Sequence, residues 1–222
     1  MNANVPAHCV IAIDGPAASG KSSVARALAK ELAFVYINSG AMYRAFTWHV
    51  LKSGVDPADS AAIAHLVDQS AIVCHISEDV AHIQIDGVDP ADHLRDDRVN
   101  DWVSPVSNVP RVREVLVTQM RAFAADRDLV VEGRDIGSVV FPATPYKFYI
   151  DASPEVRFQR RNAQGQRDPI AARDHADSSR SSSPLVVATD AIVIDSSHLP
   201  IAGVVTEILA RLKIAGFSCA HV

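Results

Sequence analysis

Short apolar runs alternate with helical patterns over much of the chain. Runs of this kind, bounded by turn residues, are typical of buried strands in a parallel sheet. Five of them occupy residues 9–13, 34–37, 129–132, 147–150 and 191–195. Between them, apolar residues recur at helical spacing, as in residues 41–52 and in the stripe of Val112, Leu116, Met120 and Phe123. The pattern predicts an α/β fold in which helices cover both faces of a five-stranded parallel sheet.

Proline and asparagine mark the points where three further helices begin. Asn108 can cap a helix that has Pro110 near its first position. Ser153 and Pro154 open a second helix, and Pro200 opens a third. We therefore expect helices that start close to residues 110, 154 and 200.

Two segments interrupt the alternation of strand and helix. Residues 55–108 contain a short helix near residues 63–67 and then two runs of period-2 alternation, at residues 72–76 and 81–85. We interpret them as a small inserted subdomain with an antiparallel patch. Residues 157–183 are polar and rich in Arg and Ser, as a surface linker would be. We expect one domain, residues 1–222, to carry both segments.

Composition and charge exclude several classes of protein. The 222 residues are 48% hydrophobic with a mean hydropathy of +0.09, and the longest apolar runs are too short to cross a bilayer. We expect no membrane span, and the lack of a basic and apolar leader favours the cytoplasm. A net charge of −5 argues against a nucleic-acid partner, because such domains carry a basic excess. Cys9, Cys74 and Cys219 form no CxxC pair, so neither disulfides nor a thiolate zinc site are indicated.

One glycine-rich segment carries a specific chemical signal. It fits the pattern G-x-x-x-x-G-K-[ST] and continues one residue further, as Gly15, Pro16, Ala17, Ala18, Ser19, Gly20, Lys21, Ser22 and Ser23. The glycines let backbone N–H groups surround phosphate oxygens, and the following helix directs its positive end at them. Because a strand precedes the segment and a helix follows it, we predict a P-loop that binds ATP. Lys21 would reach the outer phosphates, and Ser22 would ligate Mg²⁺.

The P-loop alone leaves the acceptor open, because motors, GTPases and small-molecule kinases share it. The guanine signature N-K-x-D of GTPases is absent from the sequence, which disfavours a switch protein. Arginines stand instead at the ends of elements, in NSGAMYR, PRVRE and VVEGRDIGSVVFP. Arg suits planar, bidentate recognition of phosphate. The sequence therefore favours transfer of the terminal phosphoryl group to a small acceptor.

These motifs, together with IDGPAASGKSS and residues 177–185, resemble those of bacterial cytidylate kinases. The resemblance runs in the same order from about residue 11 to residue 212, and the insert at residues 55–108 stands where that family carries its extra nucleotide-binding segment. It implies ATP-dependent, Mg²⁺-dependent phosphorylation of CMP and dCMP. It also implies that residues 157–183 form a mobile lid, and we expect the enzyme to be a monomer.

The resemblance assigns roles position by position. Lys21, Arg44 and Arg134 match residues that hold the acceptor phosphate, and the nucleoside pocket is matched by Ser39, Ser104, Arg113 and Asp135. Arg173 and Asp177 match residues near the acceptor sugar and lid, and Arg180 matches a lid arginine at the transferring group. The resulting catalytic set is Lys21, Arg134, Asp177 and Arg180. A carboxylate such as Asp135 can accept a hydrogen bond from the amino group of cytosine, whereas uracil presents an oxygen there.

The sequence departs from the family pattern in the lid, and it leaves open some residue roles and the function itself. The segment between Arg160 and Arg173 is shorter than the usual lid region. Asp14 and Glu132, both at strand ends, are the candidates for orienting the waters of Mg²⁺. Solvated charges on helices are the expected role of Arg111, Arg121, Arg127, Arg157 and Arg211. The alternative functions are a kinase for UMP, AMP or a non-nucleotide acceptor, and a nucleotide-binding regulatory module without turnover.

Overall fold

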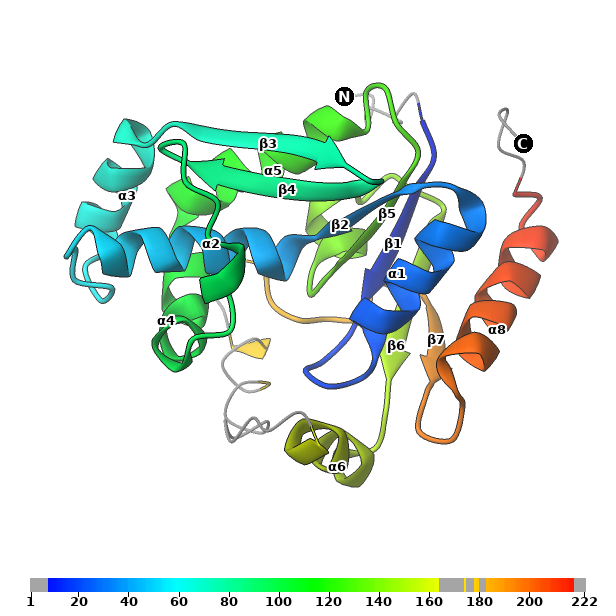
Figure 1. Ribbon diagram of the computed structural model, residues 1–222. Helices are drawn as coiled ribbons and strands as arrows, with labels where there is room; N and C mark the ends of the chain where they lie inside the picture. The colour runs from blue at the N-terminus through cyan, green and yellow to red at the C-terminus, as the bar shows by residue number, and fades with distance from the viewer. Residues whose placement is uncertain (1–7, 164–173, 175–177, 180–182, 218–222) are drawn as a thin grey trace.

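A single sheet of seven strands forms the centre of the molecule (Figure 1). The computed structural model describes residues 8–163, 174, 178–179 and 183–217. The strand order is β3-β4-β2-β5-β1-β6-β7. In chain order the strands are β1 (Val10–Asp14), β2 (Val35–Asn38), β3 (Ile72–Ser77), β4 (Val80–Ile85), β5 (Leu129–Gly133), β6 (Tyr146–Asp151) and β7 (Ile192–Asp195). The strands from β2 to β7 in this order are parallel, which confirms the five predicted strands.

The predicted number of strands is wrong, because a hairpin joins the edge of the sheet. β3 and β4 pair antiparallel, and β4 lies beside β2, where Tyr36 pairs with Val80. The backbone N–H of Tyr36 also donates to the carbonyl of Asp79 at 2.8 Å. Without the hairpin, β2 would be an edge strand with unpaired backbone groups, and native sheets cover such edges. The antiparallel patch therefore extends the main sheet.

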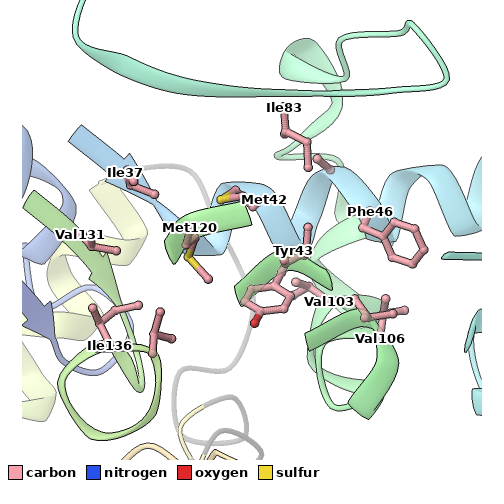
Figure 2. Packing of buried hydrophobic residues seen from close by; sticks show 14 of the residues in the cluster. Ile37, Met42, Tyr43, Phe46, Ile83, Val103, Val106, Met120, Val131 and Ile136 are labelled. Carbon is pink, nitrogen blue, oxygen red and sulfur yellow. The ribbon is translucent and has the colours of Figure 1, made fainter. Parts of the chain in front are cut away.

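Helices cover both faces of the sheet (Figure 1). Successive residues of a strand point to opposite faces, so each strand contributes to two cores. Val10 and Ala12 pack in a cluster with α2 (Ser39–Lys52) and α5 (Pro110–Phe123), whereas Ile11 and Ile13 pack with α1 (Lys21–Leu32) and α8 (Ile201–Ile214). Figure 2 shows the first cluster, where side chains from α2 and α5 meet those of β2, β4 and β5 in the sheet.

The remaining described helices connect these layers. They are α3 (Ser60–Gln69), η1 (Ala91–His93), α4 (Asp97–Ser107), the π-helix η2 (Ile136–Val140) and α6 (Pro154–Ala163). The predicted starts close to residues 110, 154 and 200 agree with α5, α6 and α8, which begin at Pro110, Pro154 and Ile201.

The structure corrects the prediction that Asn108 caps the helix at Pro110. Asn108 instead ends α4, a helix that the sequence analysis did not predict, and Val109 precedes α5 without a side-chain cap. Pro105 lies inside α4, and proline normally argues against a helix interior, so the sequence did not indicate this helix. The buried residues Val99, Val103 and Val106 recur at helical spacing and are the signal that could have revealed α4.

Candidate active site

The glycine-rich segment forms the turn between β1 and α1. Gly15 has φ +154°, and a Cβ atom there would lie 2.1 Å from the carbonyl oxygen of Ile150 in β6. Gly20 adopts φ +90° directly before α1. The ammonium of the buried Lys21 donates to the carbonyl oxygen of Pro16 at 3.0 Å. The predicted strand, loop and helix are thus present, and only glycine fits the first position of the loop.

Three strand ends meet at this loop because of the register of the sheet. Asp14 of β1 pairs with Gly133 of β5, and Asn38 of β2 pairs with Glu132. The hydroxyl of Ser22 donates to Glu132 Oε1 at 2.7 Å, and the hydroxyl of Ser39 donates to the backbone carbonyl of Glu132 at 2.8 Å. Glu132 is buried, and it therefore ties the P-loop helix to the start of the helix at Ser39.

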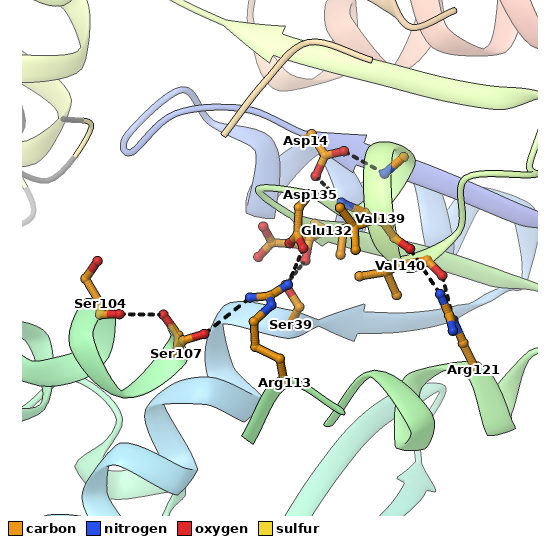
Figure 3. Close-up of polar contacts among 12 residues, drawn as sticks. Asp14, Ser39, Ser104, Ser107, Arg113, Arg121, Glu132, Asp135, Val139 and Val140 are labelled. Atoms are coloured by element: carbon orange, nitrogen blue, oxygen red, sulfur yellow. Dashed lines mark hydrogen bonds and ion pairs between the residues drawn. The ribbon is translucent and has the colours of Figure 1, made fainter. Parts of the chain in front are cut away.

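A buried ion pair stands behind the turn that follows β5. The guanidinium of Arg113, from α5, donates to the carboxylate of Asp135, and both side chains are almost fully enclosed. The same guanidinium reaches the backbone carbonyl of Ser107 and lies 5.4 Å from the centre of the Tyr43 ring. Figure 3 shows this chain of contacts running from α4 to Asp135. Since each charge of a buried pair needs its partner, the pair fixes both side chains.

Asp14, at the end of β1, contacts the same turn from the other side. Its two carboxylate oxygens accept hydrogen bonds from the backbone N–H groups of Ile136 and Gly137, each at 2.8 Å (Figure 3). Burial raises the pKa of Asp14 from 3.8 to about 6, although the two hydrogen bonds act in the opposite direction. Neighbouring Asp135 raises the pKa further and Lys21 lowers it. Both oxygens of Asp14 are therefore engaged by backbone.

A pocket lies between the P-loop and the turn after β5. Predicted residues that line it are Ala17, Ala18, Gly20, Lys21, Ser22, Ser23, Ser39, Arg44, Glu132, Arg134 and Asp135. Of the other predicted residues, Gly15, Pro16 and Ser19 lie in the loop but do not line the pocket. Arg113 stands behind Asp135, and Ser104 accepts a hydrogen bond from Ser107 through its backbone carbonyl. Arg173, Asp177 and Arg180 lie outside the described residues.

The pocket also contains residues that the sequence analysis did not assign to it. They are Asn38, Gly40, Tyr43, Val103, Ser107, Gly133 and Arg161. Tyr43 and Val103 are buried apolar positions of α2 and α4, so their spacing indicated only the core. Arg161 falls within the predicted lid, in a run of arginines on α6. That run was the feature of the sequence that could have indicated a place in the pocket.

Arg157 corrects the prediction of a solvated charge, whereas Arg121 is exposed as predicted but also donates to backbone. Arg157 of α6 donates to the carbonyls of Ala152 and Ala17 and pairs with Asp174. Arg121 of α5 donates from Nε to the carbonyl of Val140 at 2.8 Å and from Nη2 to that of Val139 at 3.0 Å. Backbone carbonyls at the ends of loops and helices lack hydrogen-bond donors within their own segment. Arg can donate to such carbonyls from a segment that is distant in the sequence.

Comparison with known proteins identifies a family. The sequence matches the family described as cytidylate kinase over residues 11–214. A cytidylate kinase of Mycobacterium leprae is 44% identical over 216 residues, which cover 92% of this chain and 95% of that protein. A cytidylate kinase of Rhodococcus jostii is 46% identical over 214 residues, which cover 90% of this chain and 93% of that protein.

Among solved structures, a gluconokinase from Sinorhizobium meliloti aligns with 95% of this chain and 94% of its own, with 15% identity and a TM-score of 0.49. A similarity at this level does not bear on activity. Over the residues that the structure describes, no helix has both the length and the apolar character needed to span a membrane.

Proposed function

The chain belongs to the cytidylate kinase family, and we propose that it transfers the γ-phosphoryl group of ATP to CMP, and also to dCMP, giving ADP and CDP or dCDP. The observation that carries this proposal is the shared pocket, in which Lys21 and Ser22 of the P-loop face the Arg134–Asp135 turn. Phosphoryl transfer depends on positioning and on charge neutralisation more than on covalent chemistry. In this pocket the P-loop would hold the donor ATP, and the turn after β5 would hold the acceptor close to it.

On the donor side, the P-loop backbone and Lys21 hold the phosphates of ATP. Ser22 and Glu132 offer oxygen donors 2.7 Å apart at the loop, a set that fits a hard cation such as Mg²⁺. Bound together with ATP, Mg²⁺ neutralises charge on the outer phosphates. Ser22 would hold the ion and Glu132 would orient its waters. The other candidate, Asp14, already accepts two backbone hydrogen bonds, so we assign this role to Glu132.

On the acceptor side, Arg44 and Arg134 hold the phosphate of CMP, and Asp135 reads the base. Arg113 pairs with the carboxylate of Asp135 and fixes its direction. An ionised carboxylate accepts a hydrogen bond from the amino group of cytosine but faces a lone pair in uracil. A site built to bind a substrate N–H discriminates strongly against an analogue that lacks it. Ser39 and Ser104 complete the nucleoside pocket in this assignment.

The remaining roles belong to the lid. We propose that residues 157–183 close over the site, that Arg173 and Asp177 reach the acceptor sugar, and that Arg180 stabilises the transferring group. Arg161 of α6 already lines the pocket and supports the position of this segment. Closure excludes water, which would otherwise accept the phosphoryl group. The insert at residues 55–108 contributes α4 and its Ser104 to the acceptor side. All these groups come from one chain, so we propose that a monomer carries the reaction.

The test is an ADP-release assay with ATP, Mg²⁺ and, separately, CMP, dCMP, UMP, AMP and GMP. We expect the highest kcat/KM with CMP and dCMP. Lys21→Met should lower kcat by about 100-fold or more, because a phosphate ligand is lost at the transition state. Asp135→Ala should bring the rates with CMP and UMP together, and Arg111→Gln, a surface variant on α5, should match the parent. Equal rates with CMP and UMP in the parent protein would refute the role of Asp135, and an unchanged rate in Lys21→Met would refute the donor site.

A further inference from the structure

The π-helix η2 is held by a side chain at each of its ends (Figure 3). At its start, the carboxylate of Asp14 accepts from the N–H groups of Ile136 and Gly137. At its end, the guanidinium of Arg121 donates to the carbonyls of Val139 and Val140. π-Helices are rare and occur often at functional sites. The hydrogen bonds from Asp14 of β1 and Arg121 of α5 therefore restrain this five-residue segment in addition to the hydrogen bonds within it.

The position of η2 determines the position of Asp135. The backbone carbonyl of Asp135 accepts from the N–H groups of Val139 and Val140, at 2.9 and 3.0 Å. Asp135 is therefore the first residue of the hydrogen-bonded unit, and it is one of the residues that line the pocket. Any displacement of η2 moves the Asp135 backbone with it.

Helix α5 holds both the side chain of Asp135 and the far end of η2. Arg113 pairs with the Asp135 carboxylate, and Arg121, eight residues later on the same helix, holds the carbonyls that end η2. Arg121 is exposed, and an exposed arginine gains little from ordering unless it satisfies groups that need a partner. Its contacts are directed at backbone of the segment that carries Asp135, while Arg111 on the same helix pairs with the surface carboxylates Asp68 and Glu114.

We propose that Arg121, together with Asp14, is a positioning residue that sets the preference of the acceptor pocket for cytosine over uracil. The inference rests on the proposed role of Asp135 as the group that reads the base. Repulsion of uracil requires that the carboxylate cannot turn away from the uracil oxygen. When η2 loses an anchor, Asp135 can move, so the hydrogen bond to cytosine weakens and the penalty against uracil is relieved. Displacements of about 1 Å have large effects on such contacts.

The experiment compares Arg121→Gln with the control Arg111→Gln. For each variant, kcat/KM is measured with CMP and with UMP at saturating ATP, and KM for ATP is measured separately. We expect Arg121→Gln to lower the CMP/UMP ratio of kcat/KM by about tenfold, and to change KM for ATP by less than about twofold. Arg111→Gln should leave all three values unchanged. Arg121→Lys keeps a cation but loses the planar fork, so its ratio should lie between those of the parent and Arg121→Gln.

Two results would overturn the inference. One is a CMP/UMP ratio in Arg121→Gln equal to that of the parent. The other is an equal loss with CMP, UMP and ATP, which indicates general damage to the fold. If Arg121→Gln does not fold, Arg121→Lys and Asp14→Asn give the same comparison, because each weakens one anchor of η2.

Asp135→Ala, measured alongside, separates this inference from the proposed function. If Asp135→Ala lowers the CMP/UMP ratio and Arg121→Gln does not, only the role of Arg121 fails. If Asp135→Ala keeps the ratio, Asp135 does not read the base, and both conclusions are overturned.

Discussion

Asp14→Asn removes one charge beside the site with almost no change in side-chain shape. Asp14 is buried, and desolvation by that burial is the main reason that its pKa rises from 3.8 to about 6. A carboxyl group with a raised pKa in the folded state favours folding when it is protonated. Its stabilising effect is fully present below pH 3.8 and is lost as the pH rises through about 6. The ionised form that Asp14 takes at neutral pH therefore lowers the stability of the protein.

The magnitude follows from the difference between the two pKa values. Between the fully protonated and the fully ionised state, this difference corresponds to about 3 kcal/mol of unfolding free energy. About half of it, on the order of 1 to 2 kcal/mol, falls between pH 5 and pH 8, because the carboxyl group of the unfolded chain is already ionised at pH 5. Asparagine does not titrate in this range. Asp14→Asn should therefore become more stable relative to the parent, by about 1 to 2 kcal/mol, when the pH is raised from 5 to 8.

Urea unfolding of both proteins at pH 5 and pH 8 measures this change. The quantity to compare is the difference in unfolding free energy between variant and parent at each pH, since contributions common to both proteins cancel. The charged groups that act on Asp14 are Asp135 and Lys21, and both are present in each protein. The hydrogen bond lost in the variant changes stability equally at both values of pH. An identical difference at pH 5 and pH 8 would refute the reasoning that burial raises the pKa of Asp14.

Two further substitutions test the fold that supports the site. Gly15→Ala places a Cβ 2.1 Å from the carbonyl oxygen of Ile150, at a residue with φ +154°. We therefore expect thermal unfolding to show that the free energy of unfolding falls by more than about 2 kcal/mol. A melting temperature equal to that of the parent would contradict the geometry. Leu116→Ala removes a fully buried side chain from the core that contains α2 and α5, and urea unfolding should show a loss of about 2 to 5 kcal/mol. Its control, Ile214→Ala at a side chain that is 80% exposed, should stay within about 0.5 kcal/mol of the parent.

Local patterns made the parallel strands and the P-loop predictable. The five strands are short apolar runs because both faces of the sheet are covered, and such runs are visible in sequence. The P-loop is equally local, since Gly15, Gly20, Lys21 and Ser22 act through one turn and the helix that follows it. The predicted residues that line the pocket lie at the end of β5 or in the segments that directly follow β1, β2 and β5.

Contacts between distant segments could not be read from these patterns. The hairpin joins the sheet through one pairing, Tyr36 with Val80, so its alternation suggested a separate patch. The anchors of η2 join residues 122 and 19 positions apart, Asp14 to Ile136 and Arg121 to Val140. Neither spacing has a signature in sequence, and an arginine on an exposed helix face has the same local pattern whether it is solvated or bonded to a carbonyl.

The register between β1 and β5 brings the P-loop and the turn after β5 together. Ile13 pairs with Glu132 and Asp14 with Gly133, so the residues that follow each strand emerge side by side although they are 119 positions apart in the chain. A slip of one residue would turn Glu132 to the opposite face of the sheet, away from Ser22, and would move the N–H groups of η2 away from Asp14. The slip would also exchange the side chains that β5 packs into the two cores, where Leu129 and Val131 lie on one face and Val130 on the other. Sheet packing and the hydrogen bonds of Glu132 and Asp14 thus specify the same register, and the geometry of the site depends on both.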